Sequence, residues 1–148
     1  MALIDLIIQE VVRVPLASTS KPEIIRELLG VLTEAGEISE IEPAYKAIME
    51  REAKGSTGLE DGIAVPHAKT DVVKKLTIAV GISKKGADFD ALDGKLSHLF
   101  FLLLAPPGQS GPHIEALAEI ARLMRSKSLY ESLVHASSPQ EVVGIIKE

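Results

Sequence analysis

The sequence contains no cysteine and no tryptophan, and only two tyrosines and three phenylalanines among its 148 residues. Without cysteine the chain can form no disulfide, no thiolate nucleophile and no cysteine-based metal site. Because aromatic residues are scarce, the core has to be built from leucine, isoleucine, valine and alanine. The lack of cysteine also fits a reducing compartment.

The chain also lacks a basic cluster and a long hydrophobic run. Its formal net charge is −5, and its lysines and arginines are scattered, which argues against nucleic acid as a partner. The longest apolar run, Leu99 to Ala105, is far shorter than the roughly 20 residues of a membrane-spanning helix. Residues 1–10 lack the basic start and the cleavage site of a signal peptide. We therefore expect a cytoplasmic protein without a membrane segment.

Two helices are predicted in the first third of the chain. Ser20 supplies a polar cap and Pro22 a first-turn proline, and the apolar residues that follow recur at helical spacing over about 22–35. Pro43 opens a second helix, which ends at the segment 55–58, Gly-Ser-Thr-Gly.

Two strands are predicted in the middle of the chain. Residues 76–83 alternate weakly and are rich in β-branched side chains, and 96–105 is a nearly continuous apolar run, as expected for a strand that is covered on both faces. We expect Lys84-Lys85-Gly86 to form a turn that separates two extended segments, and Asp93-Gly94 to close a hairpin.

Two further helices complete the pattern. One follows the proline- and glycine-rich segment 106–111, with Pro112 in its first turn, and another begins near Ser138-Pro139. The side chains expected to face inward on the former are Ile114, Leu117, Ala118, Ala121 and Met124. Helices thus bracket a run of strands, which predicts one compact α/β domain over residues 1–148, with a mixed central sheet flanked by helices on both faces.

Four histidines are present, at positions 67, 98, 113 and 135. No two of them share a metal-binding spacing, and no carboxylate cluster accompanies them, so we predict neither a metal nor another cofactor. We assign His98 to the sheet and His135 to the solvated surface, and give neither a functional role.

His67 is the candidate for chemistry, in the segment Gly62-Ile-Ala-Val-Pro-His-Ala-Lys69. Pro66 makes Val65 extended and fixes the direction of the chain just before the imidazole. Glycines at 55, 58 and 62 would let a phosphate or a partner approach the backbone closely. Taken alone, the segment favours a structural turn histidine, and the functional reading depends on the other candidate residues.

His113 and Arg51 are two further candidates. His113 follows Pro112 in the first turn of its helix, where free N–H groups favour a bound anion and a neutral imidazole, although it could also be a partly exposed first-turn residue. Arg51 flanks the apolar stripe of its helix and could neutralise phosphate oxygens. A surface ion pair, for instance with Glu52, is the alternative for Arg51.

These residues together resemble one protein family. Arg51-Glu52, then Ser56-Thr57-Gly58, then the segment 62–69, and finally His113 with 116–118 are similar to the mannitol/fructose-type enzyme IIA domain of the bacterial phosphotransferase system. That family includes the nitrogen-branch regulatory protein, and the similarity spans nearly the whole chain.

The resemblance implies a phosphotransferase that is phosphorylated on His67, with His113 as the second active-site histidine and Arg51 as the active-site arginine. It implies HPr as the phosphoryl donor and a cysteine of a IIB domain as the acceptor. Asp61 stands where some relatives have glutamate, and its shorter side chain puts an orienting role in doubt. We expect any sugar permease to be a separate protein.

Three functions remain open at this point. A carrier for sugar uptake passes its phosphoryl group to a IIB domain, and a nitrogen-branch regulator changes its binding to partner proteins when it is phosphorylated. A plain interaction domain does neither. The coincidence of Arg51, His67 and His113 favours the first two, and the sequence does not choose between them.

Overall fold

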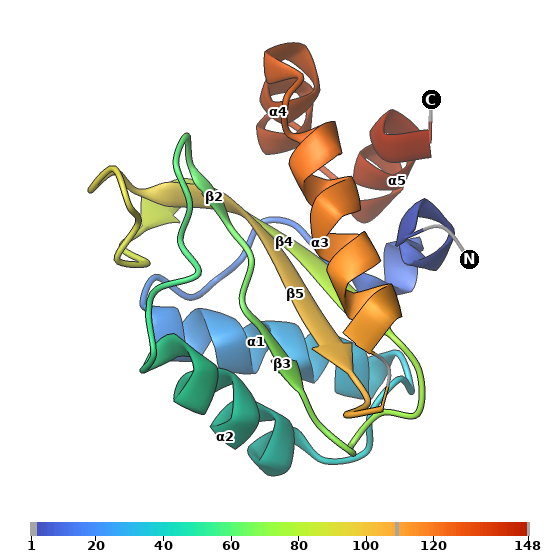
Figure 1. Ribbon diagram of the computed structural model, residues 1–148. Coiled ribbons are helices and arrows are strands. Elements are labelled where there is room, and N and C mark those ends of the chain that lie inside the picture. The colour runs from blue at the N-terminus through green and yellow to red at the C-terminus, as the bar shows by residue number, and fades with distance from the viewer. Residues whose placement is uncertain (1–2, 109, 148) are drawn as a thin grey trace.

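The computed structural model describes residues 3–108 and 110–147. Two short 3-10 helices, five α-helices and five strands follow one another along the described chain (Figure 1). Their bounds are η1 Leu3–Leu6, η2 Gln9–Val11, β1 Val12–Arg13, α1 Lys21–Glu34, α2 Ile41–Glu52, β2 Ile63–Ala64, β3 His67–Lys69, β4 Thr77–Ala87, β5 Ser97–Ala105, α3 Ser110–Leu123, α4 Lys127–Val134 and α5 Pro139–Lys147.

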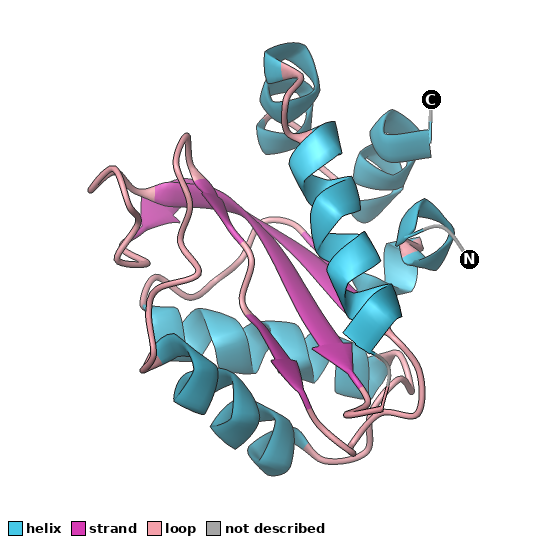
Figure 2. Cartoon of the chain, in the orientation of Figure 1, coloured by secondary structure: helices cyan, strands magenta, loops and turns pink. Residues whose placement is uncertain are grey.

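The strands form one mixed sheet in the order β1-β4-β5-β2, with β3 also paired to β5. β4 and β5 are antiparallel neighbours at its centre, while β1 runs parallel to β4, and both β2 and β3 run parallel to β5. Since β2 and β3 are consecutive pieces of the chain beside the same strand, the connection between them stays at the sheet edge (Figure 2). That connection is Val65-Pro66.

Helices cover both faces of this sheet, as predicted. Alternate residues of β5 divide between the two layers, because successive side chains of a strand point to opposite faces. Phe100, Leu102 and Leu104 pack with α1 and α2, whereas Leu99, Phe101 and Leu103 pack with α3, α4 and α5. All six are fully buried, which explains why β5 reads as a continuous apolar run.

The first helix begins where its cap signal predicts. The Ser20 hydroxyl accepts a hydrogen bond from the Glu23 amide, which makes Ser20 the N-cap of the helix, and donates one to the Glu23 carboxylate. The apolar stripe that follows, from Ile24 to Leu32, is fully buried against the sheet. α2 lies beside α1 and contacts β3, so its last turn comes close to the start of that strand.

The expected turn at Lys84-Lys85-Gly86 is wrong. β4 continues through this segment to Ala87, with an irregular register against β5 between Ile82 and Ala87. Gly86 has a φ of 84°, and this left-handed conformation produces a bulge in the strand rather than a reversal of the chain. The connection that does reverse the chain is 88–96, which contains Asp93-Gly94 as predicted.

The inward face predicted for the helix after segment 106–111 is also partly wrong. The buried residues of α3 are His113, Ala116 and Ile120, while Ile114 is 66% exposed and Ala118 and Ala121 are exposed as well. Only the half-buried Leu117 and Met124 of the predicted set pack against the core. The helix is rotated so that a histidine, rather than an isoleucine, faces the sheet.

Candidate functional site

His67 is the first residue of β3 and lies opposite Leu103 of β5. Its imidazole is half-buried, and its Nδ1 atom lies 2.7 Å from the carbonyl oxygen of Val65. Because a carbonyl oxygen can only accept a hydrogen bond, Nδ1 carries the proton of the neutral ring. The lone pair is therefore on Nε2, which is the nucleophilic atom of this tautomer.

His113 faces His67 from the other side of the site. The two ring centroids are 5.2 Å apart and the rings meet edge to face at 72°. His113 is only 6% exposed, so the alternative of a partly exposed residue is wrong. Its Nε2 atom is buried and finds no hydrogen-bond partner among the described residues. A buried, unsatisfied ring nitrogen is costly unless a ligand or water completes it.

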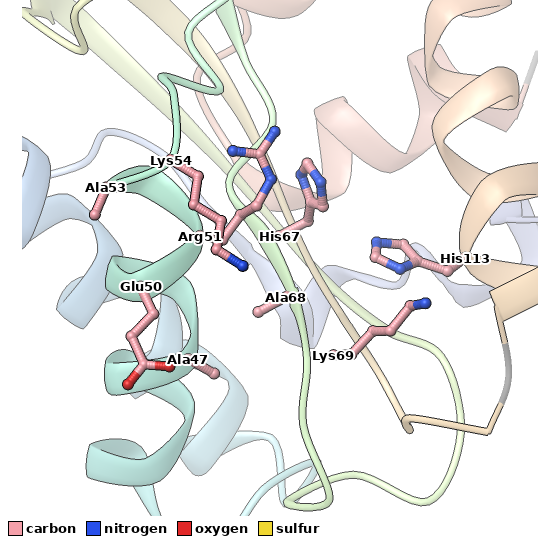
Figure 3. Close-up of a pocket in the computed structure, with 9 residues that line it drawn as sticks. All are labelled: Ala47, Glu50, Arg51, Ala53, Lys54, His67, Ala68, Lys69 and His113. Carbon is pink, nitrogen blue, oxygen red and sulfur yellow. The ribbon is translucent and has the colours of Figure 1, made fainter.

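Arg51 lies in the last turn of α2, and its guanidinium is next to the His67 ring (Figure 3). Its Nη1 donates a hydrogen bond to the carbonyl oxygen of Gly55 at 2.8 Å. The ion pair with Glu52 that sequence reasoning left open does not form, since the Glu52 carboxylate binds Lys21 and Thr57 instead.

The three predicted residues line one pocket of about 750 Å³. Its lining includes three cationic side chains and a single acidic one. The lining residues are Ala47, Glu50, Arg51, Ala53, Lys54, His67, Ala68, Lys69 and His113 (Figure 3). Such a pocket suits an anion with several oxygens.

Lys54 and Lys69 are the lining cations that sequence reasoning did not select. Lys69 stands two residues after His67 on the same strand, and residues i and i+2 of a strand point to the same side. This spacing could have placed Lys69 beside His67 from the sequence. Asp61, in contrast, is not among the residues that line the pocket, and its amide binds the Asp93 carboxylate.

Both histidines of the pocket favour the neutral form. Burial is the largest cause that lowers the pKa of His67, and the charge of Arg51 lowers it further, while the Val65 hydrogen bond and Glu52 oppose them. Burial also lowers the pKa of His113, assisted by His67 and Lys69. Near pH 7 the site therefore offers a neutral, nucleophilic imidazole in a cationic pocket.

The other two histidines lie where the sequence places them. His98 is in β5, with its Nδ1 atom 2.9 Å from the Ser83 carbonyl oxygen, and the exposed His135 follows α4. Within residues 3–108 and 110–147 no three metal-ligating side chains are grouped closely enough to hold an ion. In that same part of the chain no helix combines the length and the apolar character needed to cross a membrane.

Comparison with known proteins identifies the class of protein that carries this fold and pocket. Residues 5–148 match the family "Phosphoenolpyruvate-dependent sugar phosphotransferase system, EIIA 2". The chain therefore belongs to this family of phosphotransferase-system components.

Individual relatives come from both the sugar and the nitrogen branches. The chain is 36% identical over 129 residues to the "PTS system fructose-specific EIIA component" of Haloferax volcanii, which covers 87% of this chain and 84% of the relative. It is 34% identical over its full 148 residues to the "PTS system fructose-specific EIIABC component" of Bacillus subtilis, but spans only 23% of that longer protein.

Two solved structures share the fold. The nitrogen regulatory protein IIA-Ntr from Neisseria meningitidis is 31% identical, with a TM-score of 0.88 over 97% of this chain and 98% of that one. The IIA domain in the complex of mannitol IIA with phosphorylated mannitol IIB from Escherichia coli is 25% identical, with a TM-score of 0.78 over 93% and 94% of the two chains.

Proposed function

We propose that this protein is a cytoplasmic phosphocarrier that accepts a phosphoryl group from phospho-HPr on Nε2 of His67 and passes it to a IIB domain. One observation carries the proposal. The Val65 carbonyl holds the proton on Nδ1, so that the lone pair of Nε2 is available in a pocket lined by Arg51, Lys54, Lys69 and His113.

The transfer needs no net movement of protons. The Nε2 lone pair attacks phosphorus while the bond from phosphorus to the donor histidine breaks, and the donor ring leaves with its electron pair as a neutral imidazole. His67 keeps its Nδ1 proton, and the phosphorylated ring becomes cationic. The hydrogen bond to the Val65 carbonyl then becomes charge-assisted and stronger. In the second transfer the thiolate of the IIB cysteine attacks phosphorus, the bond from phosphorus to Nε2 breaks, and His67 leaves with its electron pair as a neutral imidazole.

The protein contributes alignment and charge. In phosphoryl transfer the negative charge spreads over the three equatorial oxygens of the transferred group. The guanidinium of Arg51 neutralises this charge, and the buried Nε2 of His113, which has no described partner, donates to one oxygen when it carries the proton. The pocket binds only the phosphoryl group and a partner protein, so specificity for a sugar belongs to the acceptor.

The comparisons support the choice of partners. The fructose-specific name of the Haloferax relative and the IIA–IIB complex in Escherichia coli favour a carrier that serves a sugar permease. The similarity to the Neisseria nitrogen regulatory protein supports the second candidate, a regulator whose phosphorylation state controls its binding to other proteins.

The test measures incorporation of phosphate from phosphoenolpyruvate in the presence of enzyme I and HPr. We expect wild type to be labelled and His67→Ala not to be. His135→Ala, which removes an exposed histidine outside the pocket, is the matched control and should be labelled normally. Arg51→Gln should slow labelling by about 100-fold, the usual cost of losing one preorganised donor. Acid-labile phosphohistidine on His67→Ala would refute the assignment.

Addition of candidate IIB domains then separates the two functions. Label that drains from His67 to a IIB cysteine establishes the sugar carrier. Label that stays on the protein in the presence of fructose- and mannitol-type IIB domains favours the regulator.

A further inference from the structure

A buried carboxylate behind the pocket is not explained by phosphate binding. Glu52 is the last residue of α2 and only 8% exposed. Its neighbour Arg51 points into the pocket, whereas the Glu52 carboxylate points away from it into the protein. Burial of a carboxylate is unfavourable unless the group is paired and hydrogen-bonded.

Glu52 satisfies this requirement with three partners. Its carboxylate lies 2.9 Å from the ammonium group of Lys21, the first residue of α1. It also accepts hydrogen bonds from the backbone amide of Thr57, at 3.1 Å, and from the Thr57 hydroxyl. Lys21 in turn contacts Asp90 at 3.0 Å and lies over the ring of Phe89. The loop after α2 is thus fastened to two other elements.

Hydrogen bonds connect this cluster to the nucleophile. Thr57 is 3% exposed, and its carbonyl oxygen accepts a hydrogen bond from the Val65 amide at 3.0 Å. The Val65 carbonyl oxygen is the group that binds Nδ1 of His67 at 2.7 Å. The peptide units on both sides of Val65 are therefore held, one by Thr57 and one by the ring.

We propose that Glu52 is a positioning residue for phosphoryl transfer: through Thr57 and Val65 it holds the imidazole of His67 in the Nδ1–H tautomer, with Nε2 aimed into the pocket. Lys21 pairs with the buried carboxylate and holds it in place. The expected effect on the rate of phosphoryl transfer rests on the proposed function, whereas the expected tautomer of His67 does not.

Two further bonds show why the loop needs a fixed position. The Ser56 hydroxyl donates to the Phe89 carbonyl at 2.6 Å, and Arg51 binds the Gly55 carbonyl. Arg51 lines the pocket, and the Val65 carbonyl binds the ring of the nucleophile. Both residues are hydrogen-bonded to the segment 55–58, Arg51 through its guanidinium and Val65 through its amide. If that segment shifts, both groups shift relative to His67.

The test compares Glu52→Gln with a matched carboxylate variant, Glu27→Gln. The side chain of Glu27 is 10% exposed, pairs with Arg13, and accepts hydrogen bonds from the amides of Ala17 and Ser18. It thus makes the same kinds of bonds, from α1 to a loop that does not line the pocket. Long-range 1H–15N spectra of the unphosphorylated proteins report which nitrogen of His67 carries the proton.

We expect wild type and Glu27→Gln to show the Nδ1–H form, and Glu52→Gln to show a mixture of both tautomers. The maximal rate of phosphate uptake should fall about 10- to 100-fold in Glu52→Gln, as expected for a misaligned nucleophile, with little change in the HPr concentration that gives half the maximal rate. An Nδ1–H tautomer and an uptake rate equal to those of Glu27→Gln would overturn the inference.

Thr57 provides a second pair of variants if Glu52→Gln does not fold. Thr57→Ser keeps the hydroxyl that binds Glu52, and Thr57→Val replaces it with a methyl group of similar size. The tautomer and the rate should remain near wild type in the serine variant and change in the valine variant, and equal behaviour of the two would overturn the inference. Absence of label on wild type would instead refute the proposed function. The 1H–15N spectra of the unphosphorylated proteins would still show whether Glu52 sets the tautomer of His67.

Discussion

Phosphorylation of His67 should raise the pKa of His113. In the unphosphorylated protein burial is the main cause that lowers this pKa, and the nearby His67 and Lys69 lower it further. A phosphoryl group on His67 places negative charge beside the same ring. The unsatisfied Nε2 of His113 would then gain an acceptor, which favours the protonated form.

The distance between the rings sets the size of the effect. Unit charges separated by 5.2 Å, the distance between the two centroids, interact by about 3 kcal/mol at an effective dielectric constant of about 20. This energy corresponds to about two pKa units. Because the pocket is open to water and salt, which screen the interaction, we expect an increase of about one to two units.

The assay is a pH titration of the His113 ring nitrogens by NMR, with and without phosphate on His67. The exposed His135 ring, which lies outside the pocket, provides an internal comparison between the two states. A His113 that titrates at the same pH in both states would refute the reasoning, because it would show that the phosphoryl group does not lie between the two rings.

Two predictions concern stability and use chemical denaturation at equilibrium. Gly58→Ala should reduce the free energy of unfolding by about 1–3 kcal/mol, because its Cβ would lie 2.6 Å from the Phe89 carbonyl oxygen. The control Gly30→Ala, whose Cβ meets no described atom within 4 Å, should be neutral or stabilising. Equal losses in the two variants would contradict the predicted clash at Gly58. Burial lowers the pKa values of His67 and His113 below about 6.5, the value expected in the unfolded chain. Below that pH the unfolded state therefore binds more protons than the folded state, and the free energy of unfolding decreases as the pH falls. The double variant His67→Gln/His113→Gln should therefore lose less free energy of unfolding than wild type between about pH 7 and pH 5. Parallel plots of unfolding free energy against pH for the two proteins would count against the lowered pKa values.

Strong local signals in the sequence predicted much of the fold. The polar cap at Ser20 with the first-turn Pro22, and the apolar run in 96–105, correctly predicted α1 and the doubly covered strand β5. α4, Lys127–Val134, was missed, although Ser126 caps it through the Leu129 amide and Leu129, Tyr130 and Leu133 recur at helical spacing. A short helix between two others leaves too few apolar residues for a clear pattern.

The wrong expectations arose where a local signal had more than one structural solution. A glycine after two lysines fits a turn and a bulge equally well, and pairing with β5 selected the bulge at Gly86. On α3, both Ile114 and His113 lie next to the apolar stripe, and periodicity favoured the isoleucine. The rotation of the helix on the sheet decided that His113 is buried.

The residue types and their order could be read from the sequence: a proline-fixed histidine at 67, an arginine at the end of a helix, and a histidine at the start of another. How these groups face one another followed only from the packing of the fold. The 5.2 Å separation of the rings depends on contacts between segments that are distant in the chain. So does the attachment of Glu52 to Lys21, because periodicity and propensity describe only neighbours along the sequence, whereas burial and hydrogen-bond partners are set by packing.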